Sequence, residues 1–398
     1  MPPNREVAIV GAGRTKFGEL YERSLISLTV EAGLNALKEA NLERKDIDEM
    51  VVGSFITEIV NEQGNLPAFL SEELGINIPI TRTEAACGSG GSALYCGITA
   101  IKSGRSDIVL VGGVEKATDW DAGIAYMAAA SEWERLYDFD FTGLNAAMAK
   151  RYLYEYPETK LEHLALISVK NHKHARDNKN AHLRNQITVE QVLNSNMVSD
   201  PLTIFHCCPV SDGAAAVILV NGELAKEFEN PVYVTGSGMS TDSIGLYARE
   251  SFTSLKATRL AAAAAFREAG RTIKDVDILE LHDAFTIQEL LAYEELGLVE
   301  KGKAWKMIEE GHKSSSRHVV YNTNGKEIIV NCGGGLKADG HPVGATGVRQ
   351  AVELYHQLTG KSDHPVSKSL GREPRVGLCQ NIGGTGSLIT VHILEVKT

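Results

Sequence analysis

Short, nearly continuous apolar runs alternate along the chain with stretches in which apolar residues recur every three or four positions. The clearest runs cover residues 7–10, 50–52, 108–111, 215–220, 328–330 and 389–393. Their composition is typical of strands that are covered on both faces. The stretch 24–40 places its apolar residues at helical spacing, which predicts a helix with one apolar face. Together these patterns predict a layered α/β fold.

A weak internal repeat relates two distant parts of the chain. Residues 36–52 read ALKEANLERKDIDEMVV and residues 265–281 read AFREAGRTIKDVDILEL, so that Glu39 aligns with Glu268, 229 positions later. Gly-rich turns that open helical stretches also occur in both parts, after Cys87 and after Gly344. Two amphipathic helices could match by chance, but the shared order of both elements favours two related halves.

The stretch 118–199 differs from both halves, because it holds two of the three tryptophans, many tyrosines and few strand signals. It predicts a largely helical loop domain over one face of the fold. The expected organisation is a first half of residues 1–117 with 200–226, this loop domain, and a second half of residues 227–398. The stretch 170–184 has five basic residues and a single acidic one; it either contacts a phosphorylated ligand or forms a solvated surface loop.

Composition narrows the possible functions. The 398 residues suffice for two or three packed units, and 43% apolar with 23% charged residues is ordinary for a globular protein. A formal net charge of −11 argues against binding to nucleic acid or to an anionic membrane. Six cysteines without a CxxC pair predict neither a disulfide scaffold nor a zinc ribbon. Without a signal-peptide pattern or an 18-residue apolar segment, we expect a cytoplasmic protein.

Cys87 stands in the most informative segment, which reads TEAACGSGGSAL. The cysteine directly precedes a Gly-Ser-Gly-Gly turn and an apolar helical stretch, so we expect it at a helix N-terminus. Unsatisfied N–H groups and the helix dipole favour a thiolate there, and the cysteine N–H can donate to an oxyanion. A buried structural cysteine is the alternative that this segment alone leaves open.

Three further segments rich in small residues present histidine or cysteine next to a predicted strand. His341 lies in GGGLKADGHPVGATG, His282 in LELHDAF, and Cys379 in LCQNIGGTGS. Each segment alone is weak evidence, because a single histidine or cysteine is usually structural. Together with the Cys87 segment they indicate one site built from four loops.

These segments resemble the four active-site loops of thiolases: CGSG at Cys87, HDAF at His282, GHP before GATG at His341, and a final glycine loop at Gly383 and Gly384. The likeness runs in order over nearly the whole chain, and HDAF and GGLKADGHP are similar to the forms in sterol-carrier-type and archaeal thiolases. The resemblance implies a five-layer α-β-α-β-α fold of two similar halves, with a helical loop domain over the active site. It also implies a homodimer or a dimer of dimers.

The resemblance further implies roles in the reversible, CoA-dependent cleavage of a 3-ketoacyl-CoA. Cys87 would carry the acyl group, and His341 would assist in activating its thiol. His282 and His341 would stabilise the enolate, and the Cys87 N–H with Gly383 or Gly384 would bind the oxyanion. CoA would be a cosubstrate bound by the loop domain, and no metal or permanently bound cofactor is implied.

One departure from the family pattern leaves the acid and base at carbon 2 open. Many thiolases carry Cys-x-Gly in the last loop, whereas here Cys379 stands further from Gly383. Some sterol-carrier-type members instead have a cysteine in the HDxF loop, where this chain has Ala284. The proton carrier is therefore either Cys379, if its loop folds inward, or a histidine, with His341 the first choice.

Two other functions fit the same motifs. A decarboxylating β-ketoacyl synthase uses a Cys-His-His set on the same fold, although the glycines after Cys87 resemble a thiolase more closely. A non-catalytic acyl-CoA-binding scaffold subunit is the second alternative. Related thiolases are often accompanied by a small protein with an OB fold and a zinc ribbon, and this chain could use such a partner. Dinucleotide binding is not predicted, because the glycine pattern at Gly11 and Gly13 lacks its third glycine.

Overall fold

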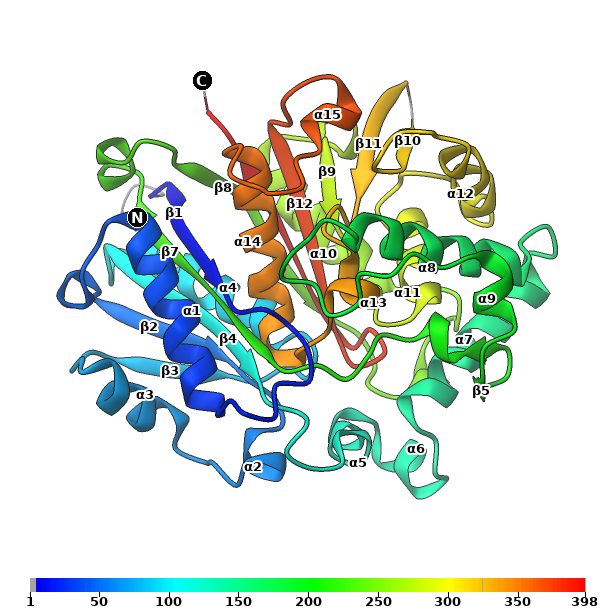
Figure 1. Cartoon of the computed structure of the whole chain (residues 1–398), viewed down its shortest axis with the longest axis horizontal. Coiled ribbons are helices and arrows are strands. Elements are labelled where there is room, and N and C mark those ends of the chain that lie inside the picture. Colours follow the sequence, from blue (N-terminus) through cyan, green and yellow to red (C-terminus); the bar gives the residue numbers. More distant parts are fainter. Residues whose placement is uncertain (1–4, 324, 398) are drawn as a thin grey trace.

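The computed structural model describes residues 5–323 and 325–397; the ends of the two predicted halves, residues 1–4 and 398, lie outside this range. The main sheet has 11 strands in the order β10-β11-β9-β12-β13-β8-β1-β7-β4-β2-β3 (Figure 1). Its strands are β1 Val7–Arg14, β2 Glu49–Gly53, β3 Ile80–Thr83, β4 Ile108–Glu115, β7 Gly213–Asn221, β8 Val232–Thr241, β9 Ile278–Glu280, β10 Val320–Thr323, β11 Lys326–Val330, β12 Val376–Gly383 and β13 Leu388–Glu395. A separate pair consists of β5 Met197–Ser199 and β6 Leu202–Thr203. Every strand predicted from the apolar runs is confirmed.

The main sheet consists of two halves that repeat one strand order. β1 and β8 join the halves through a short antiparallel contact in which Ala8 pairs with Tyr233. From this junction the strands run β1-β7-β4-β2-β3 on one side and β8-β13-β12-β9-β11 on the other. The 3-10 turns Arg44–Asp46 and Ile273–Asp275, which precede β2 and β9, lie 229 residues apart, as in the aligned sequences. The repeat inferred from the sequence is therefore confirmed.

Helices lie on both outer faces of the sheet and between its two halves (Figure 1). The helices of these layers are α1 Leu25–Ala40, α4 Ser89–Lys102, α10 Lys256–Ala269 and α14 Thr346–Leu358. α1 packs on β1 and β7, α10 packs on β8 and β13, and α4 packs against α14 in the central layer. Alternation along the strands produces this layering: Val7 of β1 belongs to the central core around α14, and its neighbour Ala8 belongs to the core under α1. The predicted five-layer arrangement is confirmed.

The stretch between β4 and β7 is largely helical, as predicted, although its proposed boundaries stay a prediction. Its helices are α5 Ala122–Tyr126, α6 Glu132–Leu136, α7 Phe141–Glu155, α8 Leu161–Ala175 and α9 Val189–Leu193. Apolar side chains of α7 and α8, such as Tyr152 and Ile167, join the core of the second half. The remaining helices are α2 Thr57–Val60, α3 Leu66–Leu74, α11 Thr286–Glu295, α12 Ala304–His312, α13 Gly335–Asp339 and α15 Ser367–Leu370. Within the described ranges, no helix combines the length and apolar character needed to span a bilayer.

The basic stretch 170–184 is helical in its first part and a partly exposed loop in its second, so it is not one solvated loop, and its contact with a phosphorylated ligand stays a prediction. Its first part is the end of α8, where Lys170 is buried and pairs with Glu289. Further along, Asp177 accepts hydrogen bonds from Arg176 and Arg317. Burying a charged group is costly without a partner, so Glu289 offsets the buried charge of Lys170, whereas the side chains of Arg176 and Asp177 stay partly exposed.

Candidate active site

Segments from both halves and from the helical stretch between β4 and β7 converge on a cavity of about 460 Å³. Cys87, His282, His341 and Gly384 line the cavity, so residues predicted from four separate motifs lie together. The helical stretch supplies one wall, formed by Asp121, Gly123, Ile124, Tyr126, Met127, Asp140, Phe141 and Thr142.

Cys87 lies at a sharp bend between β3 and α4. The preceding residue, Ala86, has a φ of 51°, in the left-handed region that costs a non-glycine residue about 1–3 kcal/mol. The Ala86 N–H donates to the Glu84 carboxylate at 2.6 Å, and Gly88 caps the helix. The surrounding contacts therefore hold a strained bend that places the cysteine at the cavity.

Burial raises the pKa of the Cys87 thiol to about 12, and the carboxyl group of Glu115 acts in the same direction. The backbone N–H groups of Cys87 and Gly384 lie close to the sulfur and partly oppose this effect. Burial outweighs the effect expected from the helix N-terminus, so the helix start alone does not make Cys87 a thiolate. The thiol needs a base, and the two N–H groups near the sulfur are candidate donors for an oxyanion hole.

Gly383 and Gly384 bring the last loop against the Cys87 bend. A Cβ atom on Gly383 would lie 2.4 Å from the Ala85 carbonyl oxygen, so only glycine allows this approach. Gly384 follows with a φ of 60° and lines the cavity, whereas Gly383 does not line it. Of the two glycines considered as oxyanion donors, Gly384 is therefore the one in position.

The His341 ring carries its hydrogen on the nitrogen that faces the protein. Nδ1 lies 2.7 Å from Oγ1 of Thr346, whose hydroxyl donates to the Pro342 carbonyl oxygen at 3.2 Å. That bond uses the only hydroxyl hydrogen, so Nδ1 is the donor and Nε2 keeps a lone pair. Nε2 is buried and has no hydrogen-bond partner among the described residues. Burial, and to a lesser extent Arg349, lowers the pKa of His341 to about 3, so the neutral ring can accept a proton at Nε2.

The His282 ring has the opposite arrangement. Its Nδ1 accepts hydrogen bonds from the Ile382 N–H at 3.3 Å and from Asn381 Nδ2 at 3.1 Å. Burial is the main cause that lowers the pKa of His282 well below its usual value, so the ring is neutral and Nε2 carries the hydrogen. The centroids of the two histidine rings are 5.1 Å apart. One ring therefore offers a lone pair and the other an N–H donor.

Asn381, which no motif signalled, connects three parts of the site. Its Nδ2 donates to the Cys87 carbonyl oxygen at 3.0 Å as well as to His282, and its Oδ1 accepts from the Gly91 N–H at 3.0 Å. The side chain thus holds the nucleophile bend, the first turn of α4 and a histidine in a fixed relation. A single asparagine within a strand gives no sequence pattern that could have revealed this role.

Glu115 is a second residue that sequence reasoning missed. Its carboxyl group is fully buried at the end of β4 and accepts hydrogen bonds from the N–H groups of Phe55 at 3.0 Å, Ile56 at 3.1 Å and Gly344 at 3.0 Å. Burial raises the pKa of Glu115 to about 7. These contacts tie the loop after β2 to the turn before α14, and so fix the His341 segment relative to the first half.

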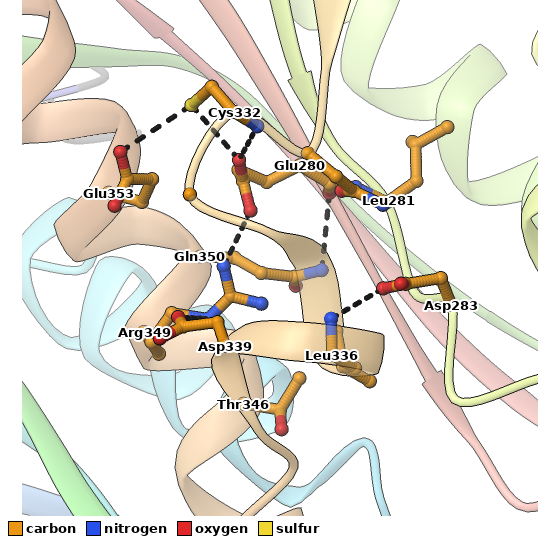
Figure 2. Close-up of polar contacts among 12 residues, drawn as sticks. Glu280, Leu281, Asp283, Cys332, Leu336, Asp339, Thr346, Arg349, Gln350 and Glu353 are labelled. Carbon is orange, nitrogen blue, oxygen red and sulfur yellow. Dashed lines mark hydrogen bonds and ion pairs between the residues drawn. The ribbon is translucent and has the colours of Figure 1, made fainter. Parts of the chain in front are cut away.

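A buried ionic network supports both histidine segments (Figure 2). Arg349 of α14 lies 2.6 Å from the Glu280 carboxylate and 3.4 Å from that of Asp339, and all three side chains are fully buried. Glu280 ends β9 two residues before His282, and Asp339 ends α13 two residues before His341. Removing one partner of such a network typically costs about 3–5 kcal/mol, because it leaves an unpaired buried charge. The network therefore fixes the spacing of the two histidines.

Cys379 lies inside β12 and not in the last loop, which corrects its predicted placement. β12 runs to Gly383 and pairs with β13 over its whole length, with Cys379 opposite His392. The Cys379 sulfur is buried, lies 3.9 Å from the His392 carbonyl oxygen, and does not line the cavity. Its role as a proton carrier stays a prediction, and none of its contacts with the described residues brings its sulfur to the cavity.

The cavity combines a protonated thiol, a neutral histidine base, a second histidine that donates an N–H, and converging backbone N–H groups. This set can perform acyl transfer through a cysteine. Across residues 5–323 and 325–397, no cluster of three or more His, Cys, Asp or Glu side chains is arranged to hold a metal ion.

Comparison with known proteins assigns the family. The model of the thiolase N-terminal domain matches residues 7–223, and that of the thiolase C-terminal domain-like family matches residues 238–396. The chain belongs to the thiolase family and is an acyltransferase of that type.

Two relatives show how far the likeness extends. The chain is 45% identical to an acetyl-CoA acetyltransferase of Methanocaldococcus jannaschii, over 99% of this chain and 100% of the relative. It is 35% identical to the benzoylsuccinyl-CoA thiolase subunit BbsB of Thauera aromatica, over 96% of each chain.

Solved structures show the same fold. The Ltp2–ChsH2(DUF35) aldolase aligns with a TM-score of 0.82 at 24% identity, over 98% of both chains. Human mitochondrial 3-ketoacyl-CoA thiolase in complex with CoA aligns with a TM-score of 0.74 at 19% identity, over 99% of this chain and 98% of that one.

Proposed function

We propose that this thiolase acts on acetoacetyl-CoA and acetyl-CoA, with Cys87 as the residue that carries the acetyl group. The observation that carries the assignment of roles is the cavity itself, where the Cys87 thiol meets two neutral histidines of opposite tautomer. Support for the acetyl group comes from the acetyl-CoA acetyltransferases of Methanocaldococcus jannaschii and Methanothermobacter thermautotrophicus, which are 45% and 44% identical over their full length.

In the direction of cleavage, the first step joins Cys87 to carbon 3 of the 3-ketoacyl-CoA. His341 Nε2 accepts the thiol proton as the sulfur attacks, which the raised pKa of Cys87 makes necessary. The oxyanion that forms at carbon 3 is stabilised by the N–H groups of Cys87 and Gly384.

The second step breaks the bond between carbons 2 and 3. The electron pair moves to carbon 2 and gives the enolate of acetyl-CoA, with negative charge on the thioester oxygen. The Nε2–H of His282 and the newly formed Nε2–H of His341 donate to that oxygen, and a proton must then reach carbon 2. CoA finally attacks the acetyl-Cys87 thioester and releases a second acetyl-CoA.

Further features of the protein belong to the same proposal. Residues of the helical stretch 118–199 would bind CoA, since they form one wall of the cavity. We also infer a homodimer or a dimer of dimers in the cytoplasm. We further infer a small OB-fold and zinc-ribbon partner. The presence of a partner is supported by two similar proteins, since one is an aldolase named with a DUF35 component and the other is named as a subunit.

The test is to supply acetoacetyl-CoA and CoA, follow the loss of acetoacetyl-CoA, and map any acetyl group by peptide mass spectrometry. Cleavage by free CoA with one acetyl group on the Cys87 peptide is the expected result. Cys87→Ala should abolish both signals, because no other thiol occupies the oxyanion hole. Cys96→Ala is the matched control: Cys96 lies on the same helix but does not line the cavity, and its loss should leave the rate unchanged.

Two outcomes would replace the proposal. If the chain needs a malonyl donor and does not cleave acetoacetyl-CoA, it is a condensing synthase. If Cys87 takes up no acetyl group and no cleavage occurs even with candidate partner proteins, the chain is a binding or scaffold subunit. Cleavage of aryl or long-chain 3-ketoacyl-CoAs in place of acetoacetyl-CoA would keep the reaction and overturn the acetyl assignment.

A further inference from the structure

A segment outside the four motif loops brings two adjacent cysteines to the cavity. Residues 207–210 run between the two histidine segments, since Cys207 pairs with Phe285 on one side and Val210 pairs with His341 on the other. Cys207 and Cys208 both line the cavity. Neither cysteine has a part in the steps described above.

Cys208 lies directly opposite Ala284. Its N–H donates to the Ala284 carbonyl oxygen at 2.8 Å, and the antiparallel pairing of Cys207 with Phe285 makes residues 208 and 284 cross-strand neighbours. Side chains of such neighbours lie on the same face, with Cβ atoms about 4.5–5.5 Å apart. Ala284 lines the cavity as well, two residues after His282. Cys208 therefore lies opposite the segment that carries His282, and both residues line the same cavity.

The two adjacent thiols differ in their surroundings. The Cys207 thiol donates to the Thr203 carbonyl oxygen at 3.6 Å, whereas the Cys208 thiol has no hydrogen-bond partner among the residues that the structure describes. The Nε2 of His341 is likewise unpartnered there and belongs to the same cavity wall. The buried Nε2 of His341 and the half-buried thiol of Cys208 are thus both open to a molecule bound in the cavity.

A buried lysine adjusts the charge around Cys208. Lys337 is 1% exposed and has no ion pair with a carboxylate within the described part of the chain. Burial raises the pKa of Cys208, which keeps its proton on the sulfur, and the ammonium group of Lys337 acts against this rise. Cys208 therefore rests as a protonated thiol, and Lys337 favours the thiolate that is left when the thiol donates its proton.

We propose that Cys208 is the acid and base that moves the proton at carbon 2. The inference rests on the proposed function, and it assigns a residue to the proton transfer at carbon 2 that the proposed function leaves open. It replaces Cys379, whose sulfur lies in the sheet core.

When the bond between carbons 2 and 3 breaks, the Cys208 S–H bond also breaks, and its proton forms the new C–H bond at carbon 2. This leaves acetyl-CoA and a Cys208 thiolate near Lys337. The incoming CoA thiol gives its proton to that thiolate and attacks acetyl-Cys87. Cys87 leaves as a thiolate and recovers its own proton from His341. In the synthetic direction, the Cys208 thiolate removes the proton from acetyl-CoA.

The test measures exchange of the carbon-2 hydrogens of acetyl-CoA with deuterated water, next to acetylation of Cys87 by acetyl-CoA. In Cys208→Ala, exchange and cleavage should fall by about 100- to 10,000-fold, the usual contribution of a general acid or base. Acetylation of Cys87 should change by less than about tenfold, because it forms no enolate and CoA thiolate is a stable leaving group at its pKa of about 8.5. Cys208→Ser should lose as much exchange as Cys208→Ala, since an alcohol is a far weaker acid than a thiol.

Cys207→Ala is the matched control, because it removes the adjacent thiol of the same wall. It should keep exchange and cleavage within about threefold of the wild type. Exchange by Cys208→Ala within about fivefold of the wild type would overturn the inference, and so would an equal loss in Cys207→Ala. Failure of the proposed function looks different: the wild type itself would then neither acetylate Cys87 nor cleave acetoacetyl-CoA.

Discussion

The central helices α4 and α14 occupy matching places in the two halves, yet their first turns serve different chemistry. The turn before α4 supplies the Cys87 thiol and a backbone N–H. α14 begins at Thr346, whose hydroxyl sets the tautomer of His341. The repeated halves therefore supply a symmetric frame, while the segments that precede the two helices make the site asymmetric.

The frame also brings the two helix starts into contact. A Cβ atom on Gly90, in the first turn of α4, would lie 2.7 Å from the carbonyl oxygen of Gly344, just before α14. The backbones therefore approach closely, and the nucleophile and the base come from opposite halves to one cavity. Substitutions at either helix start test whether the two turns have these separate roles.

The largest effect is expected at His341. His341→Ala should lower kcat/KM for cleavage by about 100- to 10,000-fold, because the protonated Cys87 thiol loses its base. Since burial lowers the pKa of His341 to about 3, the neutral base persists above about pH 4, and the wild type should show no acid limb from this group at higher pH. Steady-state rates from pH 5 to 9 would check both points. A limb at pH 6–7 that His341→Ala removes would contradict the neutral assignment.

His282 should come next, because it acts on the enolate alone. His282→Ala should lower cleavage by about 100- to 1,000-fold, the usual cost of one oxyanion donor. Acetylation of Cys87 should stay within about threefold of the wild type, since that step forms no enolate. Single-turnover acetylation measured beside steady-state cleavage separates the two. A loss of cleavage under about fivefold would make His282 structural.

Much of the frame could be predicted, because it depends on local patterns. The apolar runs gave six of the strands, and the repeat gave α1, α10 and the turns before β2 and β9 at a constant spacing. Motifs also identified Cys87, His282, His341 and Gly384, since small residues beside histidine or cysteine are a local signal.

The features that the sequence did not predict share one cause: they depend on contacts between residues that are distant in the sequence. Cys379 was expected in a loop because glycines follow it, but pairing with β13 extends β12 to Gly383. The Cys87 pKa depends on burial by both halves, which outweighs the local effect of the helix start. Cys208 gains its place only through pairing with the segment around Phe285.

Thr346 tests the start of α14 directly. Thr346→Val keeps the shape but removes the oxygen that accepts from His341 Nδ1–H. A hydrogen bond to a charged group contributes about 1.5–3 kcal/mol, so cleavage should fall by roughly 10- to 100-fold. Thr346→Ser retains the hydroxyl and should restore most of the rate. Equal losses in both variants would show that packing, and not the tautomer, is what Thr346 provides.

The start of α4 can be tested by alkylation of Cys87 with iodoacetamide at several pH values. Because the pKa of Cys87 is raised to about 12, the thiolate fraction and hence the rate should rise about tenfold per pH unit from pH 7 to 9. The same peptide in the urea-unfolded chain should level off near its ordinary pKa of about 8.5. A plateau near pH 7 in the folded protein would instead reveal a resting pair of thiolate and imidazolium.

The smallest effect on activity is expected at Cys379, because its side chain lies in the sheet core and not at the cavity. Its sulfur packs in the central core and contacts the His392 carbonyl oxygen, so Cys379→Ala removes buried volume and no catalytic group. Cleavage and deuterium exchange should stay within about twofold of the wild type, while urea unfolding should show a loss of about 1–2 kcal/mol for the small buried cavity. Loss of exchange at unchanged stability would show that Cys379 transfers the proton at carbon 2. In that case β12 would have to turn the Cys379 side chain toward the cavity during turnover. The unbroken pairing of β12 with β13 on both sides of Cys379 opposes such a turn, because a shift by one residue would reverse the facing of every side chain in the strand.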